Sequence, residues 1–519
     1  MEKQLETYQT KKEKAIVIGG GIAGLMTARV LSDHYQEVMI VERDVLPQVL
    51  PQVPSARPGT PQAFHPHRIL PRGGMIMEDL FPGYVDDLLA QGAHPTQNEK
   101  MTLFTSYGNM TMFSPEKSAS SSRALLEWTF RQRVQNISNI RFLSGQEVTG
   151  LQTSADLKQV TGIHIKERGE QKQKRTVAAD LVIEAGGRFS KLTKWLEAIG
   201  RKVPEPERLK VSLGYSTRYY RVPPHIKEKW GSFVSEAQPA KGIGTGMLGY
   251  IEDDMAQTLL FSAGGAHYPS TDPEEYKKEL HALASPKIAE VVKELEPIGT
   301  PRGYRTPESV RQHFEQMEDW PAGLLVVGDA FCNFDPIYGQ GMSVAAIEAE
   351  VLDICLSEQR YTSQPNFELN VLQRMQEAIE PAWWLSSVAD LRWEGVKHVG
   401  AEPLKGVSFA QKYFDLYNKM AVKLAKEENN PSLFQQYFMM NALVLSPHEI
   451  INPRTLNMLL TGDGSQEEKQ LLAELGDIDE QQIQGRLDEL IPSFTLAFDQ
   501  KATNPFSSMS HDRLGDHID

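Results

Sequence analysis

The sequence predicts an α/β protein with a mostly parallel sheet in three layers, an inserted antiparallel sheet and a helical C-terminal region. Three observations support this fold class. Residues 15–42 have the pattern of a short buried strand, a glycine-rich turn, an apolar-periodic helix and a second strand. Residues 211–263 contain alternating segments that are typical of antiparallel strands. Beyond about residue 394 the apolar positions are separated by Lys, Glu and Gln, which is typical of helices.

The glycine-rich turn follows the apolar run Ala15–Ile18. Gly19, Gly21 and Gly24 form the pattern G-x-G-x-x-G, and the second strand ends in Glu42. In such a unit one glycine permits the turn, one lets the backbone approach a pyrophosphate, and one lets helix and strand pack closely. The helix N-terminus offers N–H groups to the phosphates, and the acidic residue meets the ribose hydroxyls. The pattern favours a Rossmann-like dinucleotide site over a purely structural turn.

The same glycine pattern recurs at Gly244, Gly246 and Gly249. Because no apolar strand precedes it and no helical pattern follows it, we interpret it as a glycine-rich turn between strands. The chain therefore has one predicted nucleotide-binding unit.

The length, net charge and cysteine content of the chain limit the classes of molecule and compartment that are expected for it. The chain has 519 residues, enough for two or more domains, and its net charge of −14 disfavours nucleic acid and anionic membranes. No run approaches the ~18 apolar residues of a membrane span, and the polar residues 1–14 do not resemble a secretory signal. Cys332 and Cys355 are the only cysteines, and we expect both to be reduced in a cytoplasmic protein. No oligomeric state is predicted.

Prolines and glycines interrupt residues 46–74, so regular structure is expected to resume near Met75. His65 and His67 stand two residues apart in this connection, as two metal ligands on a strand would. No third ligand of suitable type lies nearby in the sequence, so no metal site is predicted. Either histidine could instead lie beside a cofactor ring.

The next segments predict strands at 101–105 and 110–113, a helix over 121–135, and strands at 141–143, 160–165 and 177–183. Arg123 lies in the first turn of that helix, where a cation opposes the helix dipole, so it is either exposed or paired with an anion. Gly186 and Gly187 follow a buried strand and indicate a close approach of the backbone to another group.

Helices are expected at 274–283 and 288–295, and residues 324–327 form another buried strand with Asp329 at its carboxyl end. A proline- and glycine-containing loop then leads to a helix that starts at Gln340-Gly341. Ligands of open α/β sheets bind at such strand ends, so Asp329 is expected to bind a hydroxyl of the same nucleotide. The helix N-terminus is expected to face a developing negative charge.

The apolar stretch 433–447 has three interpretations: core, a lid over an apolar pocket, or a peripheral membrane contact. Core is favoured because buried helices are the commoner source of such a run.

The order of these motifs resembles that of the single-component flavoprotein monooxygenases with the para-hydroxybenzoate hydroxylase fold, and is most similar to their polyether-epoxidase and squalene-epoxidase-like branch. The resemblance spans roughly residues 14 to 395. It rests on the first glycine motif with Glu42, on DLVIEAGGRFS at 180–190, and on GDAFCNFDPIYGQGM at 328–342. The chain departs from the aromatic hydroxylases in carrying Phe331 and Cys332 near a position where they often have histidine, and in lacking their Asp-Gly pair before Gly187.

The resemblance implies FAD as the cofactor and NAD(P)H as the reductant. It implies that Glu42 holds the FAD ribose, that Arg123 and Asp329 contact the pyrophosphate or ribityl region, and that the segment from Pro336 to Met342 borders the isoalloxazine. The cofactor-binding candidates are Gly19, Gly21, Gly24, Glu42, Arg43, Arg123, Gly186, Asp329, Gly341 and Met342. The candidates at the reacting ring are Pro336, Gly339 and Gly341.

The implied division of the chain is a discontinuous FAD-binding domain (14–75, 100–200 and 300–395), a substrate domain (76–99 and 201–299) and a C-terminal helical region (396–519). The implied reaction is epoxidation or hydroxylation by one oxygen of O2, through a flavin C4a-hydroperoxide.

The aromatic and apolar residues of 211–263 favour a lipophilic, alkene-containing substrate over a small aromatic acid, which would need an arginine in the pocket. Arg218 and Arg221 are accordingly expected on the outer face of their sheet. The alternatives are an FAD-dependent reductase or dehydrogenase of a prenyl-type substrate, a halogenase, and a non-oxygenating flavoprotein. The halogenase motif Trp-x-Trp-x-Ile-Pro is absent from the sequence.

Overall fold

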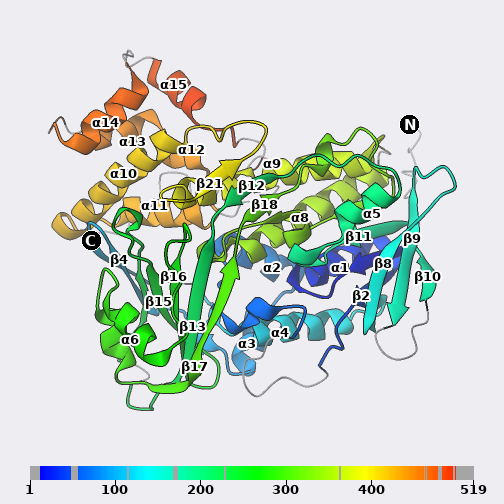
Figure 1. Ribbon diagram of the computed structural model, residues 1–519, viewed down its shortest axis with the longest axis horizontal. Coiled ribbons are helices and arrows are strands. Elements are labelled where there is room, and N and C mark those ends of the chain that lie inside the picture. The colour runs from blue at the N-terminus through cyan, green and yellow to red at the C-terminus, as the bar shows by residue number, and fades with distance from the viewer. Residues whose placement is uncertain are drawn as a thin grey trace, which may run out of the picture.

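The computed structural model describes residues 12–47, 57–113, 116–167, 174–226, 229–361, 364–460, 462, 464–476, 482–494 and 497. One of its sheets has five strands in the order β19-β11-β1-β2-β7, of which β2 and β11 are labelled on the right of Figure 1. Its strands are β1 (Lys12–Ile18), β2 (Tyr35–Glu42), β7 (Ile140–Ser144), β11 (Leu181–Glu184) and β19 (Leu324–Val326). Every pairing is parallel, so the carboxyl ends of all five strands meet at one edge of the sheet.

Helices and a small antiparallel sheet cover this parallel sheet. The helices are α1 (Ile22–His34), which packs against α4 (Arg123–Gln135) and α8 (Gln340–Tyr361), and α9 (Phe367–Asp390), which packs on α8. The antiparallel strands are β8 (Gln146–Thr153), β9 (Val160–Glu167) and β10 (Lys174–Ala178), and this sheet packs against β2 and β11. The predicted fold class, a parallel-sheet domain with a separate antiparallel sheet and C-terminal helices, is confirmed.

The predicted single strand at 177–183 is wrong, because the structure divides it between two sheets. Strand β10 ends at Ala178 and pairs antiparallel with β9, whereas β11 pairs parallel with β1. The two strands separate at Asp180, whose N–H donates to the Lys14 carbonyl and whose Oδ2 accepts from the Lys14 N–H at 2.9 Å. A contact with a distant strand therefore ends one strand and begins the next.

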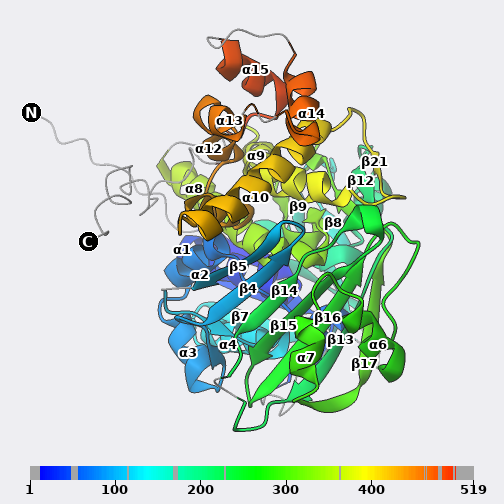
Figure 2. The ribbon, with the colours of Figure 1, turned by 90° about the vertical axis from the view of Figure 1, so that its left-hand side faces the viewer.

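A seven-stranded sheet stands beside the five-stranded one, in the order β17-β13-β16-β15-β14-β4-β5. Its strands are β4 (Lys100–Thr105), β5 (Gly108–Phe113), β13 (Leu213–Arg221), β14 (Ser232–Ser235), β15 (Thr245–Ile251), β16 (Met255–Ser262) and β17 (Glu296–Thr306). Helices α6 (Pro273–His281) and α7 (Lys287–Val292) lie over one face of it, as Figure 2 shows. Its other face is free to form the wall of a site.

The second glycine pattern lies in this sheet and not in a turn. Gly246 and Gly249 belong to strand β15, and Gly244 immediately precedes it. The prediction of a turn is therefore wrong for Gly246 and Gly249, and Gly244 lies in the connection between β14 and β15. A methyl group on Gly246 would approach Leu283 Cδ1 to 2.2 Å, so close packing explains one of these glycines.

Strand pairing differs from the predicted division of the chain. That division places strands β4 and β5 in the 100–200 segment of the FAD-binding domain, and most of β17 in its 300–395 segment. All three strands pair within the seven-stranded sheet. Helix α2 (Pro71–Leu80), placed partly in the substrate domain, packs on α8 and α1, and α3 (Tyr84–Ala90) packs on α4. The division into three domains itself stays a prediction.

The proline-rich connection is described from residue 57 onward, and residues 48–56 lie outside the described part. A short 3-10 helix, η1 (Pro61–Phe64), lies within the connection, and α2 begins at Pro71, earlier than predicted, because proline is suited to the first position of a helix. The remaining short elements are α5 (Leu192–Ala198), a four-stranded sheet of β20 (Cys332–Asn333), β18 (Ser309–Arg311), β12 (Glu207–Lys210) and β21 (Lys397–Val399), and the pair β3 (His94–Pro95) and β6 (Ala119–Ser120).

Apart from strand β21, the regular elements in the described part of the C-terminal region are helices. Its helices are α10 (Val407–Glu427), α11 (Ser432–Asn441), α12 (Pro447–Ile450), α13 (Pro453–Leu459), α14 (Gln466–Leu475) and α15 (Ile483–Leu490). In the apolar stretch 433–447, Leu433, Phe434 and Met440 are buried and join the main core, which supports the core interpretation. Of the helices in the described ranges, none is both long enough and apolar enough to cross a bilayer.

Candidate functional site

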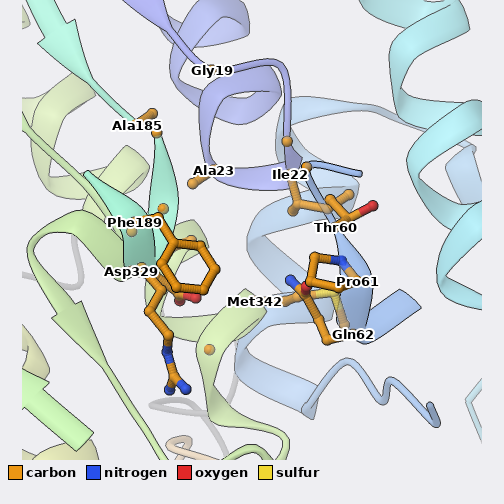
Figure 3. A pocket seen from close by; sticks show the side chains of 18 of the residues that line it. Gly19, Ile22, Ala23, Thr60, Pro61, Gln62, Ala185, Phe189, Asp329 and Met342 are labelled. Carbon is orange, nitrogen blue, oxygen red and sulfur yellow. The ribbon is translucent and has the colours of Figure 1, made fainter. Parts of the chain in front are cut away.

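A cavity of about 330 Å³ opens at the carboxyl edge of the parallel sheet. Three segments that are far apart in the sequence converge on it: the glycine turn 18–23, residues 184–191 and residues 328–345. Figure 3 shows Gly19, Ala185 and Asp329 around one space, with Thr60, Pro61 and Gln62 of the proline-rich connection on its other side, next to Met342. The predicted site residues Gly19, Gly21, Glu42, Arg43, Arg123, Gly186, Asp329, Pro336, Gly339, Gly341 and Met342 all line this cavity.

The three motif glycines have different surroundings. Gly19 has a φ of +107°, and a methyl group there would lie 2.4 Å from the Ala185 carbonyl oxygen. A methyl group on Gly24 would lie 2.0 Å from the Gly19 oxygen, so Gly24 allows helix and strand to pack and lies behind the cavity. Gly21 is the N-cap of α1, lines the cavity, and has open space where a side chain would stand.

The first turn of α1 holds no acidic side chain, and its N-cap makes no side-chain hydrogen bond. The free N–H groups and the positive end of the helix dipole therefore face the cavity next to Gly21 without a competing anion of their own. This arrangement suits a phosphate.

Glu42 ends β2 at the rim of the glycine turn and is 4% exposed. Its Oε2 accepts a hydrogen bond from the Gly20 N–H at 2.8 Å, and its Oε1 accepts one from the Asp44 N–H at 2.9 Å. The carboxylate thus fixes the shape of the turn, and its remaining lone pairs can accept from a ligand hydroxyl.

A buried charge network surrounds Glu42. Arg57 lies 3.3 Å from Glu42, 2.8 Å from Asp44 and 2.8 Å from Glu127, and Glu127 also lies 2.9 Å from Arg123. Burial lowers the pKa of Arg57, but Glu127 and Glu42 outweigh it and raise that pKa above its ordinary value. The sequence did not reveal Arg57, because its partners lie up to 70 residues away.

Arg123 is buried and paired with Glu127 on the next turn of α4, so of its two predicted environments the paired one is correct. Burial lowers the pKa of its guanidinium, and Glu127 opposes this change. Since Arg123 still lines the cavity, it presents positive charge to a ligand.

Three further carboxyl groups lie at the strand ends. Burial raises the pKa of Glu184, the last residue of β11, to about 7, and that of Glu348, on α8, to about 8. Burial also raises the pKa of Asp329, although Arg188 and Arg123 oppose it. Glu348 accepts the Gly328 N–H at 2.5 Å, and a methyl group on Gly186 would lie 2.6 Å from Glu184. Glu348 therefore holds its proton at pH 7, whereas Glu184 is about half protonated there, and both repel an anion less than fully ionised carboxylates would.

Glu184 and Glu348 were not predicted. Glu184 follows a buried strand, which was a usable signal. Glu348 lies within an apolar helix, and nothing near it in the sequence indicates that it reaches back to Gly328.

The loop before α8 forms another wall. Gly339 adopts a left-handed conformation with a φ of +68°, and Pro336, Gly339, Gly341 and Met342 line the cavity. The first turn of α8 carries no acidic residue. This second helix N-terminus can stabilise negative charge on a ligand ring.

The seven-stranded sheet contributes an apolar wall made of Tyr215, Met247, Leu259 and Tyr304. The rings of Tyr215 and Tyr304 stack with centroids 5.3 Å apart. Alternating residues point the other way: Tyr220, Leu248, Tyr250 and Leu260 form a separate buried cluster with Tyr276 of α6. Arg218 lies on that outer side and donates to the Gly299 carbonyl, and Arg221 is exposed, so neither lines the cavity.

His65 and His67 both face the cavity. His65 Nδ1 is 2.9 Å from Thr217 Oγ1, and His67 Nδ1 donates to the His65 carbonyl at 2.8 Å. Burial lowers the pKa of His65 to about 3 and that of His67 to about 4, so both are neutral at physiological pH. They act here as polar, uncharged lining.

Comparison with known proteins agrees with this geometry. A family described as "FAD binding domain" matches residues 12–359. Protein Rv3254 of Mycobacterium tuberculosis is 30% identical over 409 residues, which is 76% of this chain and 82% of that protein.

Two solved structures are similar in fold. The flavin-dependent brominase Bmp2 aligns with a TM-score of 0.57 at 15% identity, over 83% of this chain and 94% of the brominase. A probable FAD-dependent monooxygenase, pqsL of Pseudomonas aeruginosa, aligns with a TM-score of 0.52 at 16% identity, over 74% of this chain and 98% of that protein.

Proposed function

This chain belongs to the FAD binding domain family, and on that premise we propose that it is an FAD-dependent monooxygenase that uses NAD(P)H and O2 to insert one oxygen into a lipophilic, alkene-containing small molecule. The observation that carries this proposal is a single cavity with two kinds of wall. One wall consists of two glycine turns and two helix N-termini, and the other is an apolar sheet face. The first suits a flavin dinucleotide, and the second suits an uncharged substrate beside its ring.

The residues present fit FAD. The open space at Gly21 leaves room for a pyrophosphate above the N-terminus of α1, and a side chain at that position would fill it. Glu42 would bind the ribose hydroxyls, with Arg43 beside it. Arg123 and Asp329 would hold the chain between pyrophosphate and ring, as the resemblance implies.

Bound FAD, once reduced, supplies the activation of O2 and the transfer of one oxygen atom. The protein's own part is positioning and electrostatics. Backbone N–H groups of Gly341 and Met342, at the N-terminus of α8, would stabilise negative charge on the ring. Pro336 and Gly339 would set the face of the ring that the substrate meets, and the apolar wall would exclude water.

The substrate class follows from the sheet wall. Tyr215, Met247, Leu259 and Tyr304 offer apolar contacts, and the two nearby histidines are neutral. A small aromatic acid would need a cation on this wall; the two arginines of β13 lie elsewhere, and Arg68 and Arg188 line the cavity from other segments. This supports an isoprenoid, polyene or polyketide-like alkene.

Consumption of NAD(P)H and O2 by the FAD-loaded protein tests the proposal. The expected result is faster consumption with an isoprenoid or polyene alkene than with a panel of aromatic acids, with a product that has gained one oxygen. Tight coupling to a small aromatic acid would refute the substrate class. A product that has gained two hydrogens, without O2 uptake, would instead establish a reductase of a prenyl-type substrate.

A further inference from the structure

Two aspartates that have no role in the preceding sections meet at the loop 335–340, and Asp335 also lines the cavity. Asp335 follows β20 and caps the short turn at Pro336–Tyr338, and Asp390 is the last residue of α9. Both side chains are 0% exposed, and each carboxyl group acts on the pKa of the other. Two ionised carboxylates have no hydrogen to donate, so a hydrogen bond between them requires a proton on one of the two.

The hydrogen bonds that each aspartate makes to neighbouring residues indicate where that proton lies. Asp335 Oδ1 accepts the Ile337 N–H at 2.9 Å, and Asp390 Oδ1 accepts the Tyr338 hydroxyl at 2.7 Å. The two Oδ2 atoms are buried, and no N–H or O–H donor within the described residues reaches them. A proton carried by Asp390 Oδ2 and donated to Asp335 would give both carboxyl groups a partner for these remaining atoms.

The surroundings disfavour charge on both aspartates at once. The charged and titratable groups that act on the pair are Arg188 from the 187–189 turn, Tyr215 from β13, Tyr338 from the loop itself, and Tyr437 from α11 next to Tyr338. Arg188 is the cation among them, and it donates its own hydrogen bonds to Thr306 and Asn333.

Burial raises the pKa of Asp335 to about 7, and burial together with the adjacent Asp335 raises the pKa of Asp390 well above its usual range. The carboxyl group of Asp390 also lies at the C-terminus of α9, where the helix dipole opposes a negative charge.

We propose that Asp335 and Asp390 form a proton-sharing pair that ties the loop 335–340 to the C-terminal end of α9 and so holds the flavin-side wall of the cavity in its binding shape. Both residues are positioning residues. The part of this proposal that concerns the flavin rests on the proposed function, and the shared proton does not.

The pair makes stability depend on pH in a definite direction. The folded protein keeps protons on these carboxyls at pH values where the unfolded chain, with aspartate pKa values near ~3.9, has released them. The wild-type protein therefore loses stability as pH rises above about 4 and through the raised pKa values. Asp390→Asn removes one of these protons but keeps the hydrogen bonds, because its amide N–H can donate to Asp335 while its oxygen accepts from Tyr338.

The test compares chemical denaturation of the full-length protein from pH 5 to pH 8 for wild type, Asp390→Asn and Asp335→Asn. The ratio of the folding equilibrium constants, variant over wild type, is expected to rise with pH by up to about tenfold per unit. Asp79→Asn, which changes an exposed aspartate on α2, is the control and should give a ratio that changes little with pH. If the ratios for Asp390→Asn and Asp335→Asn are also independent of pH, the shared proton is refuted.

The positioning role is tested by FAD titration at pH 7, followed by flavin fluorescence. Asp390→Ala, which removes the link to the loop, should weaken FAD binding by up to about tenfold, the equivalent of one net hydrogen bond. Asp390→Asn should bind FAD like wild type. Equal FAD affinity in both variants would refute the positioning role even where the pH-dependent stability is observed. Absence of FAD binding by wild type would count against the proposed function and leave the denaturation result standing.

Discussion

Among single changes in the glycine turn, Gly21→Ala best distinguishes an effect on FAD affinity from an effect on the stability of the apoprotein. Gly21 has a φ of −79° and a ψ of −176°, which alanine adopts freely, and nothing lies within 4 Å of the added methyl group. Alanine also reduces the conformational entropy of the unfolded chain, which offsets its poorer capping of α1. The stability of the apoprotein should therefore change by less than about 1 kcal/mol.

FAD binding should respond differently, because the methyl group enters the space that the proposal gives to the pyrophosphate. Displacing one phosphate from a backbone N–H loses a charge-assisted hydrogen bond of about 1.5–3 kcal/mol, which corresponds to an affinity about 10- to 100-fold weaker. Titration of the apoprotein with FAD, followed by flavin fluorescence, measures this loss, and urea denaturation of the same sample measures stability.

Two other glycines serve as controls for Gly21→Ala. Gly249→Ala belongs to the second glycine pattern, has equally open space around its methyl group, and should leave FAD affinity unchanged. Gly19→Ala, with its positive φ and its clash with the Ala185 carbonyl, should destabilise the apoprotein by more than about 1–2 kcal/mol. Wild-type FAD affinity in Gly21→Ala would refute the placement of the cofactor, and strong destabilisation of its apoprotein would refute the account of the turn.

Three further predictions concern single side chains. Glu42→Ala should weaken FAD binding by ~1–3 kcal/mol, because a charged acceptor of the ribose hydroxyls is lost; full FAD occupancy of this variant after dialysis would contradict that role. Cys332→Ser should keep most of the NAD(P)H-dependent turnover, because Cys332 is a buried free thiol whose pKa burial raises well above its usual value; loss of turnover with FAD retained would indicate thiol chemistry. Glu348→Gln should gain stability relative to wild type by up to about 1.4 kcal/mol per pH unit between pH 5 and pH 8. The reason is that Glu348 has a pKa of about 8 in the folded protein and keeps a proton that the unfolded chain releases at about pH 4.3. Equal pH profiles of the two proteins in urea denaturation would contradict the raised pKa.

The elements that could be predicted from the sequence are those whose signals are local. The strand, glycine turn and helix at 15–34 and the helix beginning at Gln340 follow from apolar periodicity and glycine spacing. The helix that begins at Arg123 is also fixed locally, because Ser122 caps it. These segments supply most of the predicted site residues, which explains why one cavity collects nearly all of them.

The features that were missed depend on contacts between distant parts of the chain. The split between β10 and β11 depends on the pairing of Lys14 with Asp180, and no property of residues 177–183 alone indicates it. Arg57 connects the proline-rich connection to Glu127 on α4. The partner of a buried ion is set by the tertiary fold, so sequence spacing cannot identify it.

The net negative charge of the chain disfavours an anionic ligand, whereas the surroundings of the cavity favour one, and the structure explains this difference. A net charge of −14 would oppose the approach of an anionic dinucleotide if acidic groups at the site were ionised and unpaired. Instead, the carboxylates of Glu42 and Glu127 are paired with arginines, and burial keeps Glu348 protonated at pH 7 and Glu184 partly protonated. The N-termini of α1 and α8 then contribute partial positive charge at the cavity. An acidic protein can thus present a cavity suited to phosphate, because pairing and burial reduce the negative charge of the acidic side chains that line it.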